Sequence, residues 1–137
     1  MLKNNFFKPG ILLLALFLVL PLAACRQAHL SNFFDLPVTG VRSGSLTKEQ
    51  VKSVILAACK ARGWAAGETE PGLISATFTS RVHTAQIEIP YTSAKYSIIY
   101  KNSNNLKYNA QKQTIHKWYN KWVSDLRREI DDGLARK

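Results

Sequence analysis

The chain has 137 residues, with 19 Lys and Arg against 9 Asp and Glu and a formal net charge of +10. This length allows one domain with a modest core, and the charge favours anionic partners without indicating a fold. Two cysteines exclude a disulfide-rich scaffold.

Residues 1–24 are predicted to be a cleaved secretory signal peptide. Lys3 and Lys8 provide its positive beginning, and an apolar run follows over residues 11–20. This run has about half of the roughly 20 apolar residues that a membrane-spanning helix needs, and Pro21 ends it. A permanent transmembrane anchor is therefore not expected.

The next four residues, Leu22, Ala23, Ala24 and Cys25, resemble a bacterial lipobox, the motif that lipoprotein-processing enzymes recognise. The resemblance implies that Leu22, Ala23 and Ala24 direct cleavage and that Cys25 receives a diacylglyceryl group and an N-acyl chain. Two or more acyl chains hold a protein stably on a membrane. No other cofactor is expected. The alternatives are an ordinary signal peptide with an incidental cysteine, or a buried apolar helix.

Arg26 follows the lipidation site. In the enteric lipoproteins that this motif resembles, Asp at that position favours retention in the inner membrane. The resemblance therefore implies an outer-membrane lipoprotein that faces the periplasm. Once Cys25 is lipidated, Cys59 is the remaining thiol, which excludes an intrachain disulfide.

Residues 25–45 are predicted to be the lipidated cysteine and a tether to the domain. Neither a helical nor a strand period holds across this segment, and Pro37 and Gly40 interrupt it. Phe33 and Phe34 are expected either to dock on the domain or to enter the membrane interface.

The globular domain is predicted over residues 46–132. Thr47 and Gln50 have the spacing of a capping box that begins a helix, and Gly63 is placed to end it. Cys59 lies on the apolar stripe of this helix, near the C-terminal end, where the helix dipole raises a thiol pKa. We expect Cys59 to be buried and to be a poor nucleophile.

Alternating apolar and polar residues after this helix predict an antiparallel meander of three or four strands. Pro71 and Gly72 suit the centre of a type II turn. The first strand is short and lies near residues 64–68, and residues 106–108 form either a brief strand or an irregular crossing. The predicted inward-facing residues are Ile74, Ala76, Phe78, Ala85, Ile87, Ile89, Tyr96, Ile98 and Tyr100, and the first of these rows can extend to Val82.

A second helix is predicted to begin between Ala110 and Ile115. Its heavy apolar face needs a cover, and the sheet is the natural one. Gly133 predicts that residues 133–137 are a frayed tail. The predicted fold is α+β, in the order helix, strands, helix, with both helices on one face of the sheet. The apolar face comprises Ile115, Trp118, Tyr119, Trp122, Val123, Leu126 and Ile130.

Candidate catalytic and metal-ligating residues are few. Folding can bring His83 and His116 together near Glu88, but a hydrogen-bonding role at a sheet edge or helix start is the preferred interpretation. Cys59 with either histidine is the one nucleophile and base pair we find, and its expected burial argues against that role. We therefore predict no metal site, no catalytic residue and no enzyme activity.

Basic residues interleaved with aromatic ones form a candidate surface for an anionic partner. Such surfaces bind nucleic acid in other settings, but export makes that partner unexpected. An anionic glycolipid, an anionic phospholipid or an acidic envelope protein fits better. The alternative is a solvated face, because acids also lie on the second helix. The candidate residues are Lys95, Lys101, Lys107, Lys117, Lys121, Arg127 and Arg128.

Several short segments together resemble a group of small proteobacterial lipoproteins that carry no assigned activity. The resemblance covers roughly Val51 to Ile130, implies a Gram-negative envelope setting and supplies no catalytic residue. The predicted function is a non-catalytic, membrane-anchored periplasmic lipoprotein that binds an anionic or protein component of the envelope. The alternative is a small-ligand-binding or cryptic enzymatic domain with a pocket between sheet and helices. The segments are residues 62–64, 71–72, 83–85, 96–100, 103–106 and 115–123.

Overall fold

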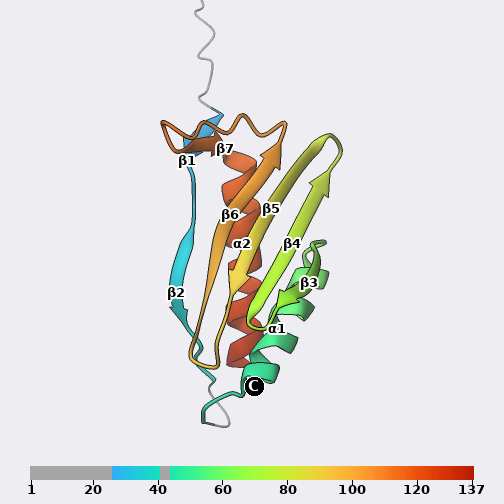
Figure 1. The fold of residues 1–137 in the computed structure, drawn as a ribbon, viewed down its shortest axis with the longest axis vertical. Coiled ribbons are helices and arrows are strands. Elements are labelled where there is room, and N and C mark those ends of the chain that lie inside the picture. Colours follow the sequence, from blue (N-terminus) through green and yellow to red (C-terminus); the bar gives the residue numbers. More distant parts are fainter. Residues whose placement is uncertain (1–25, 41–43) are drawn as a thin grey trace, which may run out of the picture.

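The computed structural model describes residues 26–40 and 44–137, which form an α+β domain. Five strands pair in the order β2-β6-β5-β4-β3 and two more pair as β1-β7, all antiparallel (Figure 1). The predicted class is confirmed, but the predicted count of three or four strands is wrong. The elements are β1 (Gln27–His29), β2 (Phe33–Pro37), α1 (Lys48–Ala61), β3 (Ala65–Glu70), β4 (Leu73–Ser80), β5 (His83–Pro90), β6 (Lys95–Asn104), β7 (Thr114–His116) and α2 (Lys117–Ala135).

Helix α1 has the ends that its sequence predicts. The Thr47 hydroxyl accepts the Gln50 N–H at 3.2 Å, and the Gln50 side chain accepts the Thr47 N–H at 2.8 Å. At the other end Gly63 has a φ of 76°, and the Trp64 N–H bonds to the Cys59 carbonyl at 2.8 Å. The helix therefore ends in the Schellman arrangement, in which a left-handed residue lets the chain turn back over the last carbonyls.

Tight turns join the central strands. Pro71 and Gly72 connect β3 to β4, and Gly72 has the φ of 91° that the third residue of a type II turn requires. Arg81 and Val82 connect β4 to β5, with Arg81 at a φ of 56°. Strand β5 ends at Pro90 as predicted. The inner rows of the central strands are buried as predicted except Phe78 and Tyr100, which are partly buried. The extension of the first row to Val82 is wrong, because this residue is exposed in the β4–β5 turn.

The second helix differs from its prediction at both ends. It begins at Lys117, because residues 114–116 pair with β1 as strand β7. It continues to Ala135, because Leu134 is buried and Gly133 lies against Val54 of α1, so the predicted frayed tail is wrong. The buried face of α2 comprises Tyr119, Val123, Leu126, Ile130 and Leu134.

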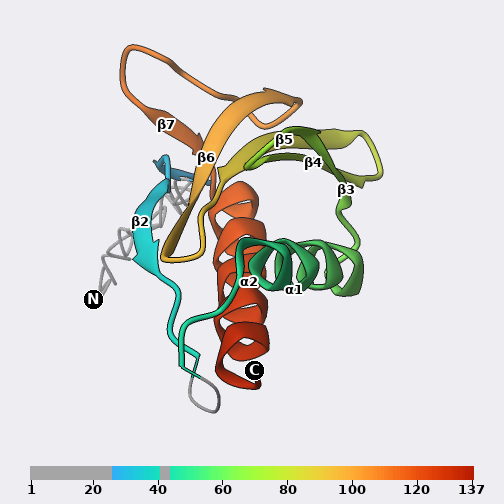
Figure 2. The ribbon, with the colours of Figure 1, turned by 60° about the horizontal axis from the view of Figure 1, so that its bottom comes forward.

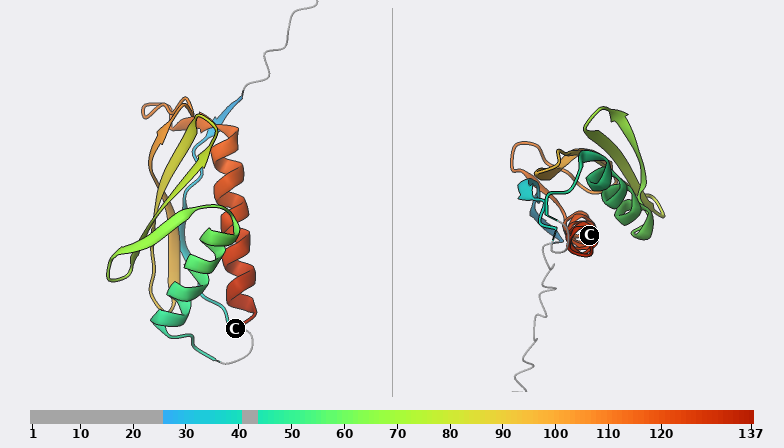
Figure 3. Two further views of the ribbon diagram at one scale, coloured as in Figure 1. Left: turned by 90° about the vertical axis from the view of Figure 1, so that its right-hand side faces the viewer. Right: turned by 90° about the horizontal axis from the view of Figure 1, so that it is seen from below.

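The helices pack differently in detail from the prediction. Figures 2 and 3 show α2 lying along one side of the sheet with α1 beside it. Among the described elements, α1 makes its main contacts with α2 and with the edge strand β3. The core between the layers contains large, fully buried side chains, among them Ile55, Ile87, Tyr96, Ile98 and Tyr119.

The predicted tether is wrong over residues 26–40, which are part of the domain. Strand β1 pairs with β7, and β2 adds an edge strand to β6. The register of β2 shifts between Phe33 and Leu36, where Asp35 has a φ of 49°, so no regular alternation appears in the sequence. The signal peptide and Cys25 lie outside the described residues. Neither described helix is long and apolar enough to span a membrane.

Candidate functional site

One end of the domain gathers segments that are far apart in the sequence. Strands β1 and β7, the loop before β7, the β4–β5 turn and the start of α2 lie together there (Figure 1). The Lys117 N–H donates to the Arg26 carbonyl at 2.9 Å, and the Gln27 side chain donates to the Lys107 carbonyl at 2.9 Å. The residue that follows the predicted lipidation site is therefore fixed at this end.

We call this region the cationic end, defined by the five exposed cations on these segments. Each has an exposed side chain, and none of the five makes an ion pair with any described residue. Their charges are therefore not neutralised within the described part of the protein. The five residues are Arg26, Arg81, Lys107, Lys112 and Lys117.

The seven predicted anion-binding residues divide into two groups. Lys107 and Lys117 belong to the cationic end. The other five are paired with acids, which supports the solvated-face alternative for them. The pairs are Lys95 with Asp35 at 2.8 Å, Lys101 with Glu88, Lys121 with Asp125 at 2.6 Å, Arg127 with Asp131 at 3.3 Å, and Arg128 with Asp125 at 3.7 Å.

No acid lies in the segments that build the cationic end. The sequence has no Asp or Glu in residues 26–34, 71–87 or 89–124. The acids of α2 are confined to residues 125–132. The acids of this helix therefore lie in its C-terminal half, where Asp125 and Asp131 pair with neighbouring bases, and none of them lies at the cationic end.

Two histidines stack beside the cationic end. The rings of His83 and His116 have centroids 6.5 Å apart and an interplanar angle of 17°. His116 caps α2, because its Nδ1 accepts the Trp118 N–H at 3.2 Å, while Nδ1 of His83 lies 2.8 Å from the Asn105 carbonyl. Both histidines thus have the predicted hydrogen-bonding roles. Glu88 pairs with Lys101 instead, and the described residues contain no group of three potential metal ligands.

The surroundings of His116 are positively charged. Burial, and then the charges of His83, Arg26, Lys107 and Lys117, lower the pKa of His116 below its usual value. No acid offsets this effect. The lowered pKa of His116 thus reflects first its burial and then the cations that surround the start of α2.

Trp118 was predicted to be a core residue, and this prediction is wrong. Its indole is 44% exposed, because it stands in the first turn of α2, and it packs edge-on against the rings of His83 and His116 at 5.1 and 4.6 Å. An open groove of about 600 Å³ runs beside it, and Val82, 64% exposed, forms part of its wall. We call this the Trp118 groove. Its lining includes Arg81, Val82, His83, Trp118, Lys121 and Trp122.

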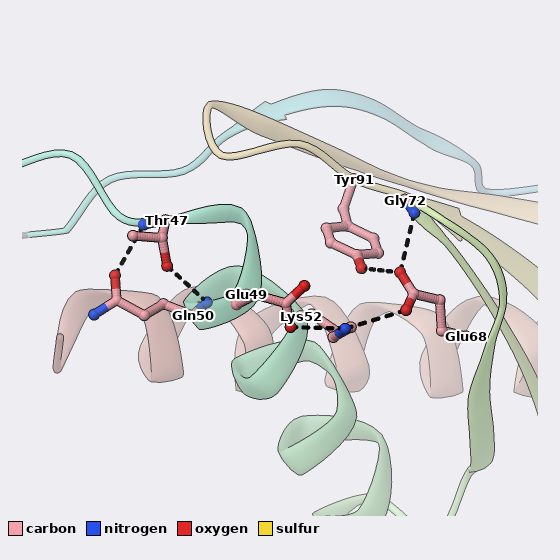
Figure 4. Close-up of polar contacts among 7 residues, drawn as sticks. All are labelled: Thr47, Glu49, Gln50, Lys52, Glu68, Gly72 and Tyr91. Carbon is pink, nitrogen blue, oxygen red and sulfur yellow. Dashed lines mark hydrogen bonds and ion pairs between the residues drawn. The ribbon is translucent and has the colours of Figure 1, made fainter.

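A separate polar network joins α1 to the β3–β4 turn, as Figure 4 shows. The Glu68 carboxylate accepts the Gly72 N–H at 3.0 Å and the Tyr91 hydroxyl, and it pairs with Lys52 at 3.1 Å. These three contacts lower the pKa of Glu68 to about 2. Burial, then the bond to Glu68, raises the pKa of Tyr91 to about 12. Both groups therefore keep one protonation state near neutral pH, which suits a structural clamp rather than proton transfer.

Cys59 is fully buried in α1, as predicted. Burial raises the pKa of its thiol to about 12. A thiol with this pKa remains protonated near neutral pH and is a weak nucleophile.

The sequence did not identify Arg26, Arg81 and Lys112 as members of one surface. Positions 26, 81 and 112 are brought together only by the fold. One feature of the sequence could have indicated a cationic surface, namely the long stretch without acids over residues 89–124.

Comparisons with protein-family models, with curated proteins and with solved structures find no match for this chain.

Proposed function

We propose that the protein is a non-catalytic lipoprotein, anchored through acyl chains on Cys25 to the outer membrane and facing the periplasm, whose cationic end binds an anionic component of the envelope. The hydrogen bond between the Arg26 carbonyl and the Lys117 N–H carries this proposal. It fixes the residue next to the predicted lipid anchor within the group of unpaired cations. The proposed lipid anchor and the unpaired cations therefore lie at the same end of the domain.

The packing of the interior favours binding of a partner at the surface over a small-ligand or enzymatic site between sheet and helices. Tyr96, Ile98 and Tyr119 fill the space between sheet and helices, and each is almost fully buried. The shifted pKa values of Glu68, Tyr91 and Cys59 lie far from neutrality, which is unfavourable for an acid, base or thiolate nucleophile.

Metabolic labelling tests the anchor. We would express the full chain in a Gram-negative host with radioactive palmitate and compare it with Cys25→Ser. The wild type should carry label and fractionate with the outer membrane, while Cys25→Ser should lack label. An unlabelled wild-type protein would overturn the lipoprotein proposal.

Co-sedimentation tests the partner class. Residues 26–137, which include all the described elements, would be mixed with outer-membrane vesicles, anionic liposomes or peptidoglycan at low and high salt. Binding that is lost at high salt is expected, because screening weakens exposed charge interactions. Binding that resists salt would contradict the electrostatic role of the cationic end.

A further inference from the structure

The position of Arg26 leaves no spacer between the predicted anchor and the domain. Cys25 and Arg26 are consecutive in the sequence, so a single peptide bond joins the predicted anchor to the first described residue. The carbonyl of Arg26 accepts a hydrogen bond from the backbone N–H of Lys117, and Gln27 pairs with His116 in the β1-β7 ladder. A domain attached in this way must keep its cationic end next to the bilayer that holds the acyl chains.

The charges of this end suit an anionic bilayer surface. Arg26, Arg81, Lys107, Lys112 and Lys117 are exposed and lack acidic partners among the described residues. Basic side chains next to a lipid anchor strengthen its attachment to anionic lipids. A spread of unpaired cations at this one place is therefore complementary to phospholipid phosphates.

The order of charges along α2 supports the same orientation. Helices are stabilised by acids near their N-terminus and by bases near their C-terminus. Helix α2 has Lys117 as its first residue and no acid in its first turn, while its acids lie in residues 125–132. This order is unfavourable in water but favourable when anions lie beyond the N-terminal end of the helix.

Exposed apolar side chains lie beside these cations. Trp118 is 44% exposed and Val82 is 64% exposed, on the two elements that line the Trp118 groove. Indole rings favour the boundary between head groups and acyl chains, because one part of the ring is apolar and its N–H is polar. Exposure of Trp118 and Val82 to water is unfavourable, whereas their insertion into a membrane interface is favourable.

We propose that the domain docks on the bilayer that holds Cys25, with anionic phospholipid head groups against Lys107, Lys112 and Lys117 and with Trp118 and Val82 in the interfacial layer. This inference rests on the proposed lipid anchor. It adds to that anchor a fixed orientation of the domain, in which the C-terminal end of α2 points away from the membrane.

Fluorescence quenching tests this orientation. The lipidated full-length product would be reconstituted into vesicles of phosphatidylglycerol and phosphatidylcholine in which a fraction of the acyl chains is brominated. Trp118 should be quenched, and Trp118→Phe should lose most of this quenching, because Trp64 is buried and Trp122, which also lines the groove, is partly buried. Vesicles of phosphatidylcholine alone should give much less quenching.

A matched pair of triple variants isolates the charges. Lys107→Gln, Lys112→Gln and Lys117→Gln together should reduce quenching in anionic vesicles to the level seen in phosphatidylcholine. Lys95→Gln, Lys101→Gln and Arg128→Gln remove the same charge from residues paired with acids and should leave quenching unchanged. Equal effects of the two triple variants would overturn the assignment of the head-group site, and circular dichroism would confirm that both remain folded.

Flotation of the vesicles separates the two proposals. Protein that does not float with the vesicles would contradict the lipid anchor itself. Protein that floats while Trp118 stays unquenched would overturn the docked orientation and leave the anchor intact. Equal quenching in neutral and anionic vesicles would overturn the role of anionic head groups.

Discussion

The backbone N–H of Lys117 donates a hydrogen bond of 2.9 Å to the carbonyl oxygen of Arg26. This bond joins the first described residue to the first residue of α2. The segment after the predicted lipidation site is consequently held by the last helix. Loss of the contacts of this segment should lower the stability of the whole domain.

Asn120 gives a direct test of this attachment. Its side chain donates to the His29 carbonyl at 2.6 Å and accepts the Ser31 N–H at 3.0 Å. Asn120→Ala loses both bonds and should lower the free energy of unfolding by about 2 kcal/mol in urea denaturation. Lys121→Ala, which removes one exposed ion pair on the same helix, should change it by less than about 0.5 kcal/mol. Equal effects of the two variants would indicate that residues 29–31 do not stabilise the fold.

Glu68 should make the domain less stable at acidic pH. The folded state lowers its pKa to about 2, so the stabilisation is complete above the unfolded pKa of roughly 4.3 and disappears as the pH falls through about 2. Glu68→Gln should lower the urea midpoint at pH 7, and its difference from wild type should shrink between those two pKa values. Glu70→Gln, on the same strand, changes an exposed carboxylate without a hydrogen-bond partner among the described residues and should have little effect. A difference for Glu68→Gln that stays constant with pH would contradict the clamp.

His116 should contribute a second pH dependence at milder acidity. Its neutral Nδ1 caps α2, and burial together with His83, Arg26, Lys107 and Lys117 lowers its pKa. The unfolded chain therefore takes up this proton at a higher pH than the folded chain does. The stabilisation is full above about pH 6.5 and is lost as the pH falls through the lowered pKa.

A variant that keeps the cap but cannot titrate isolates this effect. Asn is a good N-cap residue, so His116→Asn should retain much of the stability near pH 8 and flatten the pH dependence at acidic pH. Thermal unfolding across this range is the measurement. His29→Asn, an exposed histidine on β1, serves as the control and should keep the wild-type slope. An unchanged slope in His116→Asn would exclude His116 as its source.

Gly133 permits the close contact between the two helices. A Cβ atom there would lie 2.7 Å from Cγ1 of Val54. Overpacking typically costs about 1 to 3 kcal/mol, and the better helix propensity of Ala recovers about 1 kcal/mol. Gly133→Ala should therefore lower the free energy of unfolding by about 1 kcal/mol in urea denaturation.

A double-mutant cycle shows whether Val54 is the cause. In the Val54→Ala background, Gly133→Ala should be less harmful or neutral, because the clashing methyl group is gone. Gly67→Ala places a Cβ in open space on β3 and should have little effect. Additive effects of the Gly133 and Val54 substitutions would contradict the proposed clash.

Local signals in the sequence predicted local features well. Thr47 with Gln50, Gly63, and Pro71 with Gly72 each act within a few residues, and the structure places them as predicted. Strands β1 and β7 have three residues each and pair over a long separation, as in the register of Gln27 with His116. Short strands of this kind are stabilised by their partner and have no usable period of their own, so the sequence could not reveal them.

The candidate site was predicted in part. Charge and composition indicate Lys107 and Lys117, but the pairing of the other five candidates with acids depends on the fold. Trp118 has the helical spacing of a core residue. Its exposure depends on its place in the first turn of α2, which is a property of the tertiary structure rather than of the helix period.

In a domain anchored through Cys25 as we propose, the folded segment after Arg26 would also limit how far from the membrane the protein acts. A flexible tether would let an anchored domain explore the periplasm, whereas a chain that is folded from residue 26 would keep it at the membrane surface. The 19 residues of α2 span about 28 Å at 1.5 Å per residue, so its C-terminal end is at most about that far beyond its first turn. Under this proposal, any second partner that meets the C-terminal end of α2 would have to come within a few tens of ångströms of the bilayer.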